Sequence, residues 1–230
     1  MLKKIQYFKK SLAEFIGTFA LVFFGCGSIM VEAKFPDTIP EIAIPIIFGA
    51  IVATMIYTLG HISGAHFNPA VTLAFSITRH FPIKQLPFYW LAQFSGAIIA
   101  IIFLYFLIPD SNMFGATIPK VNILSAFIWE VVLSFFLMFV IMAVATDTRA
   151  VGIMAGIAIG TIVMLCAFIG SKFTGCSMNP ARSLAPAIFQ GTLNNIWLYF
   201  IAPAFGTILG AIAYQQIRCE TKPSSADGCC

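Results

Sequence analysis

Charge is the scarcest feature of this 230-residue sequence, in which Asp, Glu, Lys and Arg make up only 10% of the residues. A soluble domain usually carries about 25% charged and about 45–50% apolar residues, whereas here 60% are apolar and the mean hydropathy is +0.94. So few charges do not coat a water-soluble globule of this size. The same composition excludes a disordered or collagen-like chain. We therefore expect an all-α integral membrane protein.

Cysteine-based metal sites and disulfide frameworks are also missing. No Cys-x-x-Cys pair or Cys/His spacing of the kind that holds a metal occurs among the six cysteines, so we expect no metal and no cofactor. Cys229 and Cys230 end the chain and are candidates for acylation, although a flexible tail is the preferred interpretation. The basic N-terminus resembles a signal peptide but has no Ala-x-Ala cleavage site, so we expect a retained first span.

Long linkers are absent, so we expect one domain, with repeats at about 11–115 and 120–217 and a flexible cytoplasmic tail at 218–230. Two apolar pieces, at about 68–78 and 179–190, are too short to cross a membrane. The runs that are long enough to cross about 30 Å of hydrocarbon as helices are at about 11–32, 41–60, 86–108, 123–145, 151–170 and 196–217.

The few basic residues predict the orientation, because cytoplasmic loops carry an excess of Lys and Arg. A cytoplasmic N-terminus followed by six spans returns the C-terminus to the cytoplasm, and we expect the plasma membrane. The small net charge of +4 then reflects topology and not nucleic acid binding. Expected inside are Lys3, Lys4, Lys9, Lys10, Arg79, Lys84, Arg149, Arg218 and Lys222; expected outside are Lys34, Lys120, Lys172 and Arg182.

The two halves of the sequence repeat each other. Residues 63–70 match residues 174–181 at an offset of 111, and Glu14 in the first run has a counterpart in Glu130 of the fourth. Small residues repeat at an offset of 110, and glycines recur every four residues in the fifth run, a spacing that lets helices pack closely in lipid. Because each half holds three spans, the second enters the membrane from the opposite side. Such inverted repeats place their functional site near the bilayer midplane. The small residues are Ala92, Gly96 and Ala100, Ala202, Gly206 and Gly210, and Gly152, Gly156 and Gly160.

The tripeptide Asn-Pro-Ala occurs once in each half, as Asn68, Pro69 and Ala70 and as Asn179, Pro180 and Ala181. Asn is a favoured N-cap and Pro is tolerated at the first helical position, so each tripeptide predicts the start of a short helix. A single Asn-Pro is a common loop signal, but two copies at corresponding places of a repeat favour the helix starts. Helix starts are electropositive, so two of them facing each other repel a cation, while the two free Asn amide groups hold a water oxygen.

The stretches before the tripeptides, 60–67 and 170–178, have no helical or strand periodicity. Irregular backbone at membrane depth is tolerated where it is buried in protein or lines a wet cavity. A file of exposed carbonyl oxygens beside the two amide donors is typical of a pore for neutral, hydrogen-bonding molecules.

The chain resembles the aquaporin, or major intrinsic protein, family over almost its whole length. The wording of Ser-Gly-Ala-His-Phe-Asn-Pro-Ala-Val-Thr and Gly-Cys-Ser-Met-Asn-Pro-Ala-Arg-Ser is similar to the plant nodulin-like branch and its bacterial relatives. The resemblance implies two re-entrant half-helices, a homotetramer with one pore in each monomer, and a narrow outer filter. The filter positions it implies are Phe48, Ala167, Cys176 through its carbonyl group, and Arg182.

Several polar residues at membrane depth admit two interpretations. Arg182 is a pore residue that repels cations or an end-of-span arginine that reaches to the interface. Glu14 and Glu130 are proton-relay groups or, as the resemblance favours, anchors that accept hydrogen bonds from the re-entrant loops. His61 and His66 border the cytoplasmic mouth as ordinary vestibule residues or as a pH gate.

The filter positions give conflicting indications of solute. Water-selective relatives resemble a set with His where this chain has Ala167, so its filter is expected to be wider and less polar. Ser183 and the Tyr199-Phe200 pair resemble the water-type pattern instead. We expect a channel for water, glycerol, ammonia and metalloid hydroxides that excludes ions; a strictly water-selective channel is the alternative. A coupled transporter or a poorly conducting junction protein is more remote, and no nucleophile–base set predicts an enzyme.

Overall fold

The computed structural model describes residues 2–147 and 152–218, with side chains from residue 5. Arg149, Lys222, Cys229 and Cys230, and all of the expected tail except Arg218, lie outside the described residues, as do the side chains of Lys3 and Lys4. Every regular element of the described part is helical. The elements are α1 (Leu2–Lys34), α2 (Ala43–Ser63), α3 (Pro69–Ile77), η1 (Ile83–Gln85), α4 (Leu86–Leu107), α5 (Ile123–Thr146), η2 (Gly152–Met154), α6 (Ala155–Thr174), α7 (Pro180–Gln190) and α8 (Leu198–Ile217).

Six of the helices in this described part are long and apolar enough to cross a membrane, and they are α1, α2, α4, α5, α6 and α8. The two short helices α3 and α7 follow α2 and α6, as the sequence predicts. Large apolar side chains cover the outside of the bundle; Leu91, Phe106 and Leu124 are each at least 70% exposed. A surface of this kind is stable only against lipid or another apolar partner, which agrees with the expected all-α membrane fold.

The long helices pack as pairs that correspond between the two halves. Helix α1 lies on α4, α5 lies on α8, and α2 packs against α6 between the halves. A Cβ atom at Gly96 would lie 2.4 Å from the Phe15 carbonyl oxygen, and one at Gly206 would lie 2.3 Å from that of Val131, so only glycine fits. The predicted stripes therefore do bring backbones together. Gly152 is an exception, because nothing lies within 4 Å of it.

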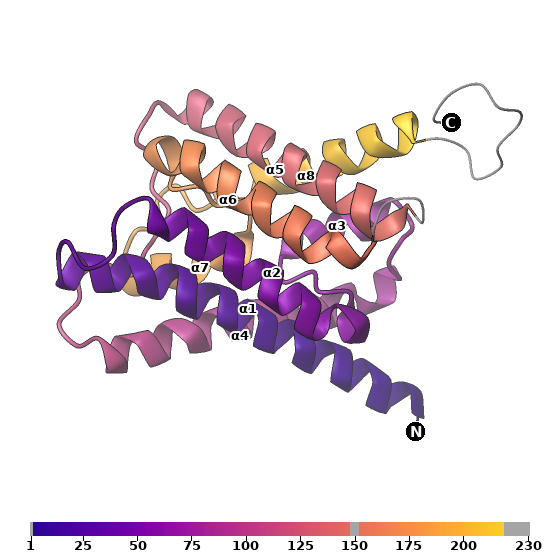
Figure 1. Ribbon diagram of the computed structural model, residues 1–230, viewed down its shortest axis with the longest axis horizontal. Coiled ribbons are helices and arrows are strands. Elements are labelled where there is room, and N and C mark those ends of the chain that lie inside the picture. Colours follow the sequence, from indigo (N-terminus) through magenta and orange to yellow (C-terminus); the bar gives the residue numbers. More distant parts are fainter. Residues whose placement is uncertain (1, 148–151, 219–230) are drawn as a thin grey trace, which may run out of the picture.

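The two short helices point in opposite directions. The start of α1 and the end of α8 lie at one end of the molecule, which we call the terminal end (Figure 1). Helix α3 ends there, where Gln215 of α8 donates to the Thr78 carbonyl. Helix α7 ends at the opposite end, where Gln190 accepts from the Phe114 backbone N–H. The two starts, Pro69 and Pro180, therefore meet inside the bundle, as an inverted arrangement requires.

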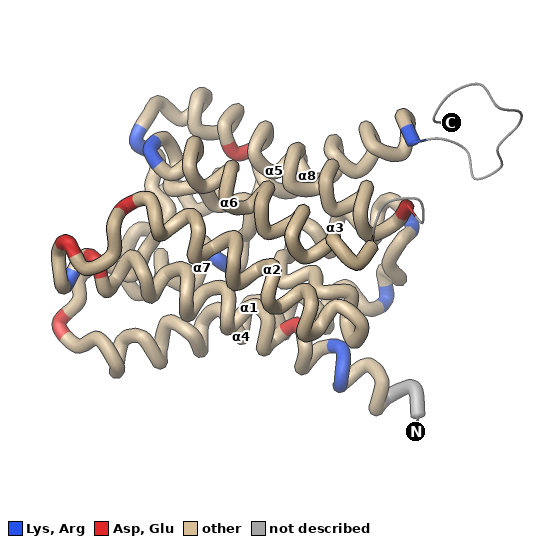
Figure 2. The backbone as a smooth tube through the Cα atoms, in the orientation of Figure 1, with Lys and Arg blue, Asp and Glu red and all other residues tan. Residues whose placement is uncertain are grey.

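Charged residues gather at the two ends of the bundle, with few between them (Figure 2). Lys34 and Lys172 lie at the end away from the termini, where Lys34 donates to the Pro109 carbonyl and Lys172 pairs with Glu41. Arg79 and Arg218 follow α3 and α8 at the terminal end. The long apolar middle is therefore free of exposed charge over the depth that lipid tails occupy.

Candidate functional site

The two Asn side chains cap the short helices. Asn68 accepts from the Ala70 backbone N–H at 2.9 Å, and Asn179 accepts from that of Ala181 at 3.0 Å. Both Asn residues have extended backbones, and a proline follows each at the first helical position. The predicted capping is therefore confirmed for both helices, and both electropositive starts point at the same place.

The Asn amide groups are only partly free, which corrects the expectation from the sequence. Asn68 Nδ2 donates to the Met178 carbonyl at 2.7 Å, and Asn179 Nδ2 donates to the Phe67 carbonyl at 2.9 Å. Each half is thus tied to the residue before the other half's cap. An amide carries two N–H groups, so one N–H of each Asn remains for a passing molecule.

The irregular stretches are shorter than predicted, because α2 continues to Ser63 and α6 to Thr174. Their backbones match residue by residue: Ala65 and Cys176 have φ of 53° and 48°, and Phe67 and Met178 have φ of 49° and 52°. Left-handed conformations cost about 1–2 kcal/mol for each such residue, so surrounding contacts must hold them.

Two fully buried carboxylates supply those contacts. Glu14 accepts from the backbone N–H groups of His66 and Phe67 at 3.0 and 2.7 Å. Glu130 does the same for Ser177 and Met178, both at 2.9 Å. This is the geometry of the anchors that the resemblance implies.

Hydroxyl groups complete each anchor, and sequence reasoning missed them. Ser63 Oγ donates to Glu14 at 2.7 Å and Thr174 Oγ1 donates to Glu130 at 2.6 Å. The Tyr89 and Tyr199 hydroxyls donate, both at 2.7 Å, to the carbonyls of the same Ser and Thr. Their spacing could have identified them as repeat partners, because Ser63 and Thr174 are 111 residues apart and Tyr89 and Tyr199 are 110 apart.

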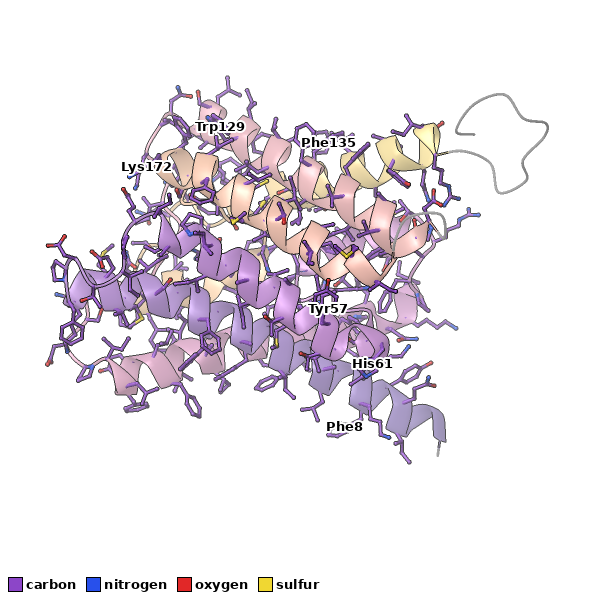
Figure 3. The ribbon with its side chains drawn as sticks, viewed as in Figure 1. Phe8, Tyr57, His61, Trp129, Phe135 and Lys172 are labelled. Atoms are coloured by element: carbon purple, nitrogen blue, oxygen red, sulfur yellow. The ribbon has the colours of Figure 1, made fainter. Side chains whose placement is uncertain are left out.

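A cavity of about 700 Å³ runs past these loops. Its lining includes Tyr57 and His61 near the terminal end, both Asn caps in the middle, and Lys172 at the other end; Figure 3 shows His61 and Lys172 toward opposite ends. The positions expected for the filter, Phe48, Ala167, Cys176 and Arg182, all line it. Within the described residues Tyr199 and Phe200 do not line this cavity, so the Tyr199-Phe200 pair does not touch a solute there.

Arg182 is buried, with only 3% of its surface exposed, so it does not reach to the interface. Its Nη1 donates to the Gly115 carbonyl at 2.6 Å and lies 3.5 Å from Cys26 Sγ. The guanidinium carbon stands 5.1 Å from the centre of the Phe48 ring, and Nε has no hydrogen-bond partner among the described residues. A permanent cation therefore faces the cavity beside an aromatic wall.

Both histidines line the cavity, His61 near its terminal end and His66 two residues before the Asn68 cap. His61 is exposed. The His66 Nδ1 atom is 3.2 Å from Thr72 Oγ1, and its ring packs against Phe75, Phe81 and Tyr89 at centroid distances of 4.7–5.2 Å. These contacts fit an ordinary vestibule residue.

The mouth away from the termini carries an ion pair between Glu41 and Lys172. The hydrogen bond from Lys172 lowers the pKa of the Glu41 carboxyl. The pair therefore stabilises the folded chain at neutral pH, and this contribution is lost as the pH falls through the lowered pKa.

Glu41→Gln is expected to change Tm at pH 7 by no more than about 4 °C, because exposed pairs contribute at most about 1 kcal/mol. Below the lowered pKa the variant and the native chain should unfold at the same temperature. Thermal scans in detergent at neutral and acid pH check this, and a larger change at pH 7 would contradict the exposed geometry.

Two capped half-helices that meet inside a lipid-facing bundle, beside a cavity whose lining extends from one end of the bundle to the other, define a membrane channel. In the described part no group of three or more His, Cys, Asp or Glu side chains is placed to hold a metal.

Comparison with known proteins identifies the kind of channel. The chain belongs to the major intrinsic protein family, whose model matches residues 1–214. It is 46% identical to nodulin-26 of Glycine max, over 97% of this chain and 83% of that one, and 44% identical to aquaporin NIP2-1 of Zea mays, over 95% and 74%. The X-ray structure of the aquaglyceroporin from Plasmodium falciparum shares the fold, with a TM-score of 0.83, 24% identity, and coverage of 92% and 96%. The protein is a multi-pass, passive membrane channel for water and small solutes.

Proposed function

We propose that the pore carries water together with small uncharged solutes such as glycerol, ammonia and metalloid hydroxides, and that it excludes protons and ions. The observation that carries this proposal is the composition of the filter. Phe48, Ala167, Cys176 and Arg182 line one cavity, and of their side chains only Arg182 offers strong hydrogen-bond donors. Ala167 adds neither bulk nor a polar atom, which leaves room for a solute larger than water.

Exclusion of cations follows from two positive features in series. Arg182 places a full charge in the cavity, and the starts of α3 and α7 each add about half a charge at the middle. A neutral solute exchanges hydrogen bonds with the free N–H of each Asn and with loop carbonyls instead. The strictly water-selective alternative requires that Phe48 and Arg182 alone close the filter to glycerol.

The wider setting is part of the same proposal. One channel domain holds two repeats, at about 11–115 and 120–217, and four copies form a homotetramer in the plasma membrane with both termini in the cytoplasm. The apolar exterior and the distribution of Lys and Arg support the membrane setting. The resemblance to the family is what supports the tetramer.

Ala167→His tests the filter directly. A histidine here adds volume and a hydrogen-bond donor to the cavity that Arg182 also lines, so we expect glycerol flux to fall by about tenfold or more while water flux falls by less than about threefold. Stopped-flow light scattering on proteoliposomes measures the glycerol and water fluxes, normalised to inserted protein. Ammonia and boric acid are measured in the same way for comparison.

Ala158→His is the matched control, because Ala158 lies on α6 but outside the cavity lining. It is expected to leave the ratio of glycerol to water flux unchanged. Native protein that passes water but no glycerol supports the strictly water-selective alternative. Flux that saturates with solute concentration indicates a transporter, and negligible water flux indicates a junction protein.

A further inference from the structure

The orientation of the filter cation depends on a loop outside the two repeated motifs. Arg182 Nη1 has one close oxygen acceptor among the described residues, the Gly115 carbonyl at 2.6 Å. Gly115 lies in the irregular connection between α4 and α5, with φ of 74°. A Cβ atom there would lie 3.2 Å from Cys26 Cβ. Whatever fixes this carbonyl therefore fixes the guanidinium.

The side chain of Gln190, the last residue of α7, fixes the direction of that carbonyl through the neighbouring backbone N–H groups. Its Oε1 accepts from the backbone N–H groups on both sides of Gly115, from Phe114 at 2.9 Å and from Ala116 at 3.3 Å. In a trans peptide the C=O of one residue points opposite to the N–H of the next. When the Ala116 N–H points at Gln190, the Gly115 C=O must point the other way, toward Arg182.

The same loop is tied to α7 a second time. Thr117 Oγ1 donates to Ser183 Oγ at 2.7 Å, and Ser183 directly follows Arg182. Helix α7 thus carries Arg182 in its first turn and Gln190 in its last turn. Gln190 orients the Gly115 carbonyl, and that carbonyl accepts the hydrogen bond from Arg182. The connection between α4 and α5 is therefore bound to α7 at both Ser183 and Gln190.

We propose that Gln190 is a positioning residue for the Arg182 guanidinium and thereby sets which solutes pass the filter. The inference rests on the proposed function, because it takes Arg182 as the filter cation. Without the Gln190 acceptor the peptide between Gly115 and Ala116 is free to turn, since glycine adopts most backbone conformations. The guanidinium then loses its oxygen acceptor and samples several orientations in the cavity.

Gln190→Met keeps the length of the side chain but removes the amide oxygen. We expect the ratio of glycerol to water flux to change by threefold or more in proteoliposomes. Gln190→Glu keeps an acceptor oxygen and should restore the native ratio to within twofold. Gln215→Met is the matched control: it removes one amide hydrogen bond, from Gln215 Nε2 to the Thr78 carbonyl at 3.3 Å, at the other end of the molecule, and should leave the ratio unchanged.

Arg182→Ala and the double variant with Gln190→Met complete the design. If Gln190 acts through Arg182, the double variant has the ratio of Arg182→Ala alone, because the two changes are not additive. If Arg182→Ala leaves the ratio of glycerol to water flux unchanged, both the filter assignment and the positioning role are wrong. If Arg182→Ala changes the ratio but Gln190→Met leaves it at the native value, only the positioning role is wrong.

Gln190→Ala repeats the test with a smaller side chain if Gln190→Met does not insert. If neither variant inserts while Gln190→Glu does, Gln190 serves folding and not the filter, and the proposal is wrong. Equal Tm values for Gln190→Met and Gln215→Met, together with a changed ratio only in the former, are the result that supports it.

Discussion

Glu130→Gln is expected to lower water flux per inserted monomer by more than about tenfold and to destabilise the chain measurably. The native carboxylate accepts three hydrogen bonds, from the Thr174 hydroxyl and from the Ser177 and Met178 N–H groups. Glutamine turns one of the two oxygens into an NH₂ group, which then faces a donor. Each buried donor left without a partner costs about 1–3 kcal/mol, and the segment that holds Cys176 and Met178 in left-handed conformations loses one of its hydrogen bonds to residue 130.

The consequence reaches the pore because Met178 does two things. Its N–H is held by Glu130, and its carbonyl accepts from Asn68 Nδ2 across the centre. Release of the loop therefore loosens the junction between the two half-helices. Stopped-flow shrinkage and thermal scans of the same preparation separate lost conduction from lost insertion.

Glu32→Gln is the matched control for this experiment. Glu32, near the end of α1, also accepts from two backbone N–H groups, those of Asp37 at 2.9 Å and Ile39 at 2.7 Å, but in the connection to α2 and outside the cavity lining. Water can replace these bonds, so flux should stay within about twofold of native. Equal losses in the two variants would falsify the assignment of Glu130 as the anchor of the pore loop.

The features that depend on local chemistry or on the internal repeat could be predicted from the sequence. The six spans follow from apolar length, and the starts of α3 and α7 follow from Asn-Pro capping, which acts within two or three residues. Repetition then paired Glu14 with Glu130 and placed the two short helices opposite each other. The same offsets carried the hydroxyl partners Ser63 and Thr174, which composition alone does not distinguish from other buried Ser and Thr.

What could not be predicted lies where partners come from unrelated parts of the chain. The Gly115 carbonyl, Cys26 and Gln190 meet around Arg182 only after the connection between α4 and α5 folds back over α7. No periodicity or repeat links these positions, and backbone carbonyl groups leave no trace in a sequence. The bonds that use half of each Asn amide were missed for the same reason, because their acceptors are the carbonyls of Phe67 and Met178.

Asn179→Asp is expected to raise sodium or proton leak by about tenfold or more at neutral pH. The oxygen that caps α7 remains available to the Ala181 and Arg182 N–H groups, so the helix start is kept. The NH₂ group becomes an oxygen that faces the Phe67 carbonyl, now 2.9 Å from Nδ2, and two acceptors repel each other. A full negative charge also cancels the two half charges at the helix starts, which removes the central barrier to cations.

Asn122→Asp is the control that isolates this effect. Asn122 caps α5 by accepting from the Ser125 N–H at 2.9 Å, and in the described residues it makes no bond across the two halves. Ion leak in this variant should equal that of the native chain, because its carboxylate only caps a helix. Acidification should reverse the leak of Asn179→Asp, since a protonated carboxyl donates as the amide did. Equal leak in the two variants at neutral pH would mean that the meeting point of the half-helices is not what excludes cations.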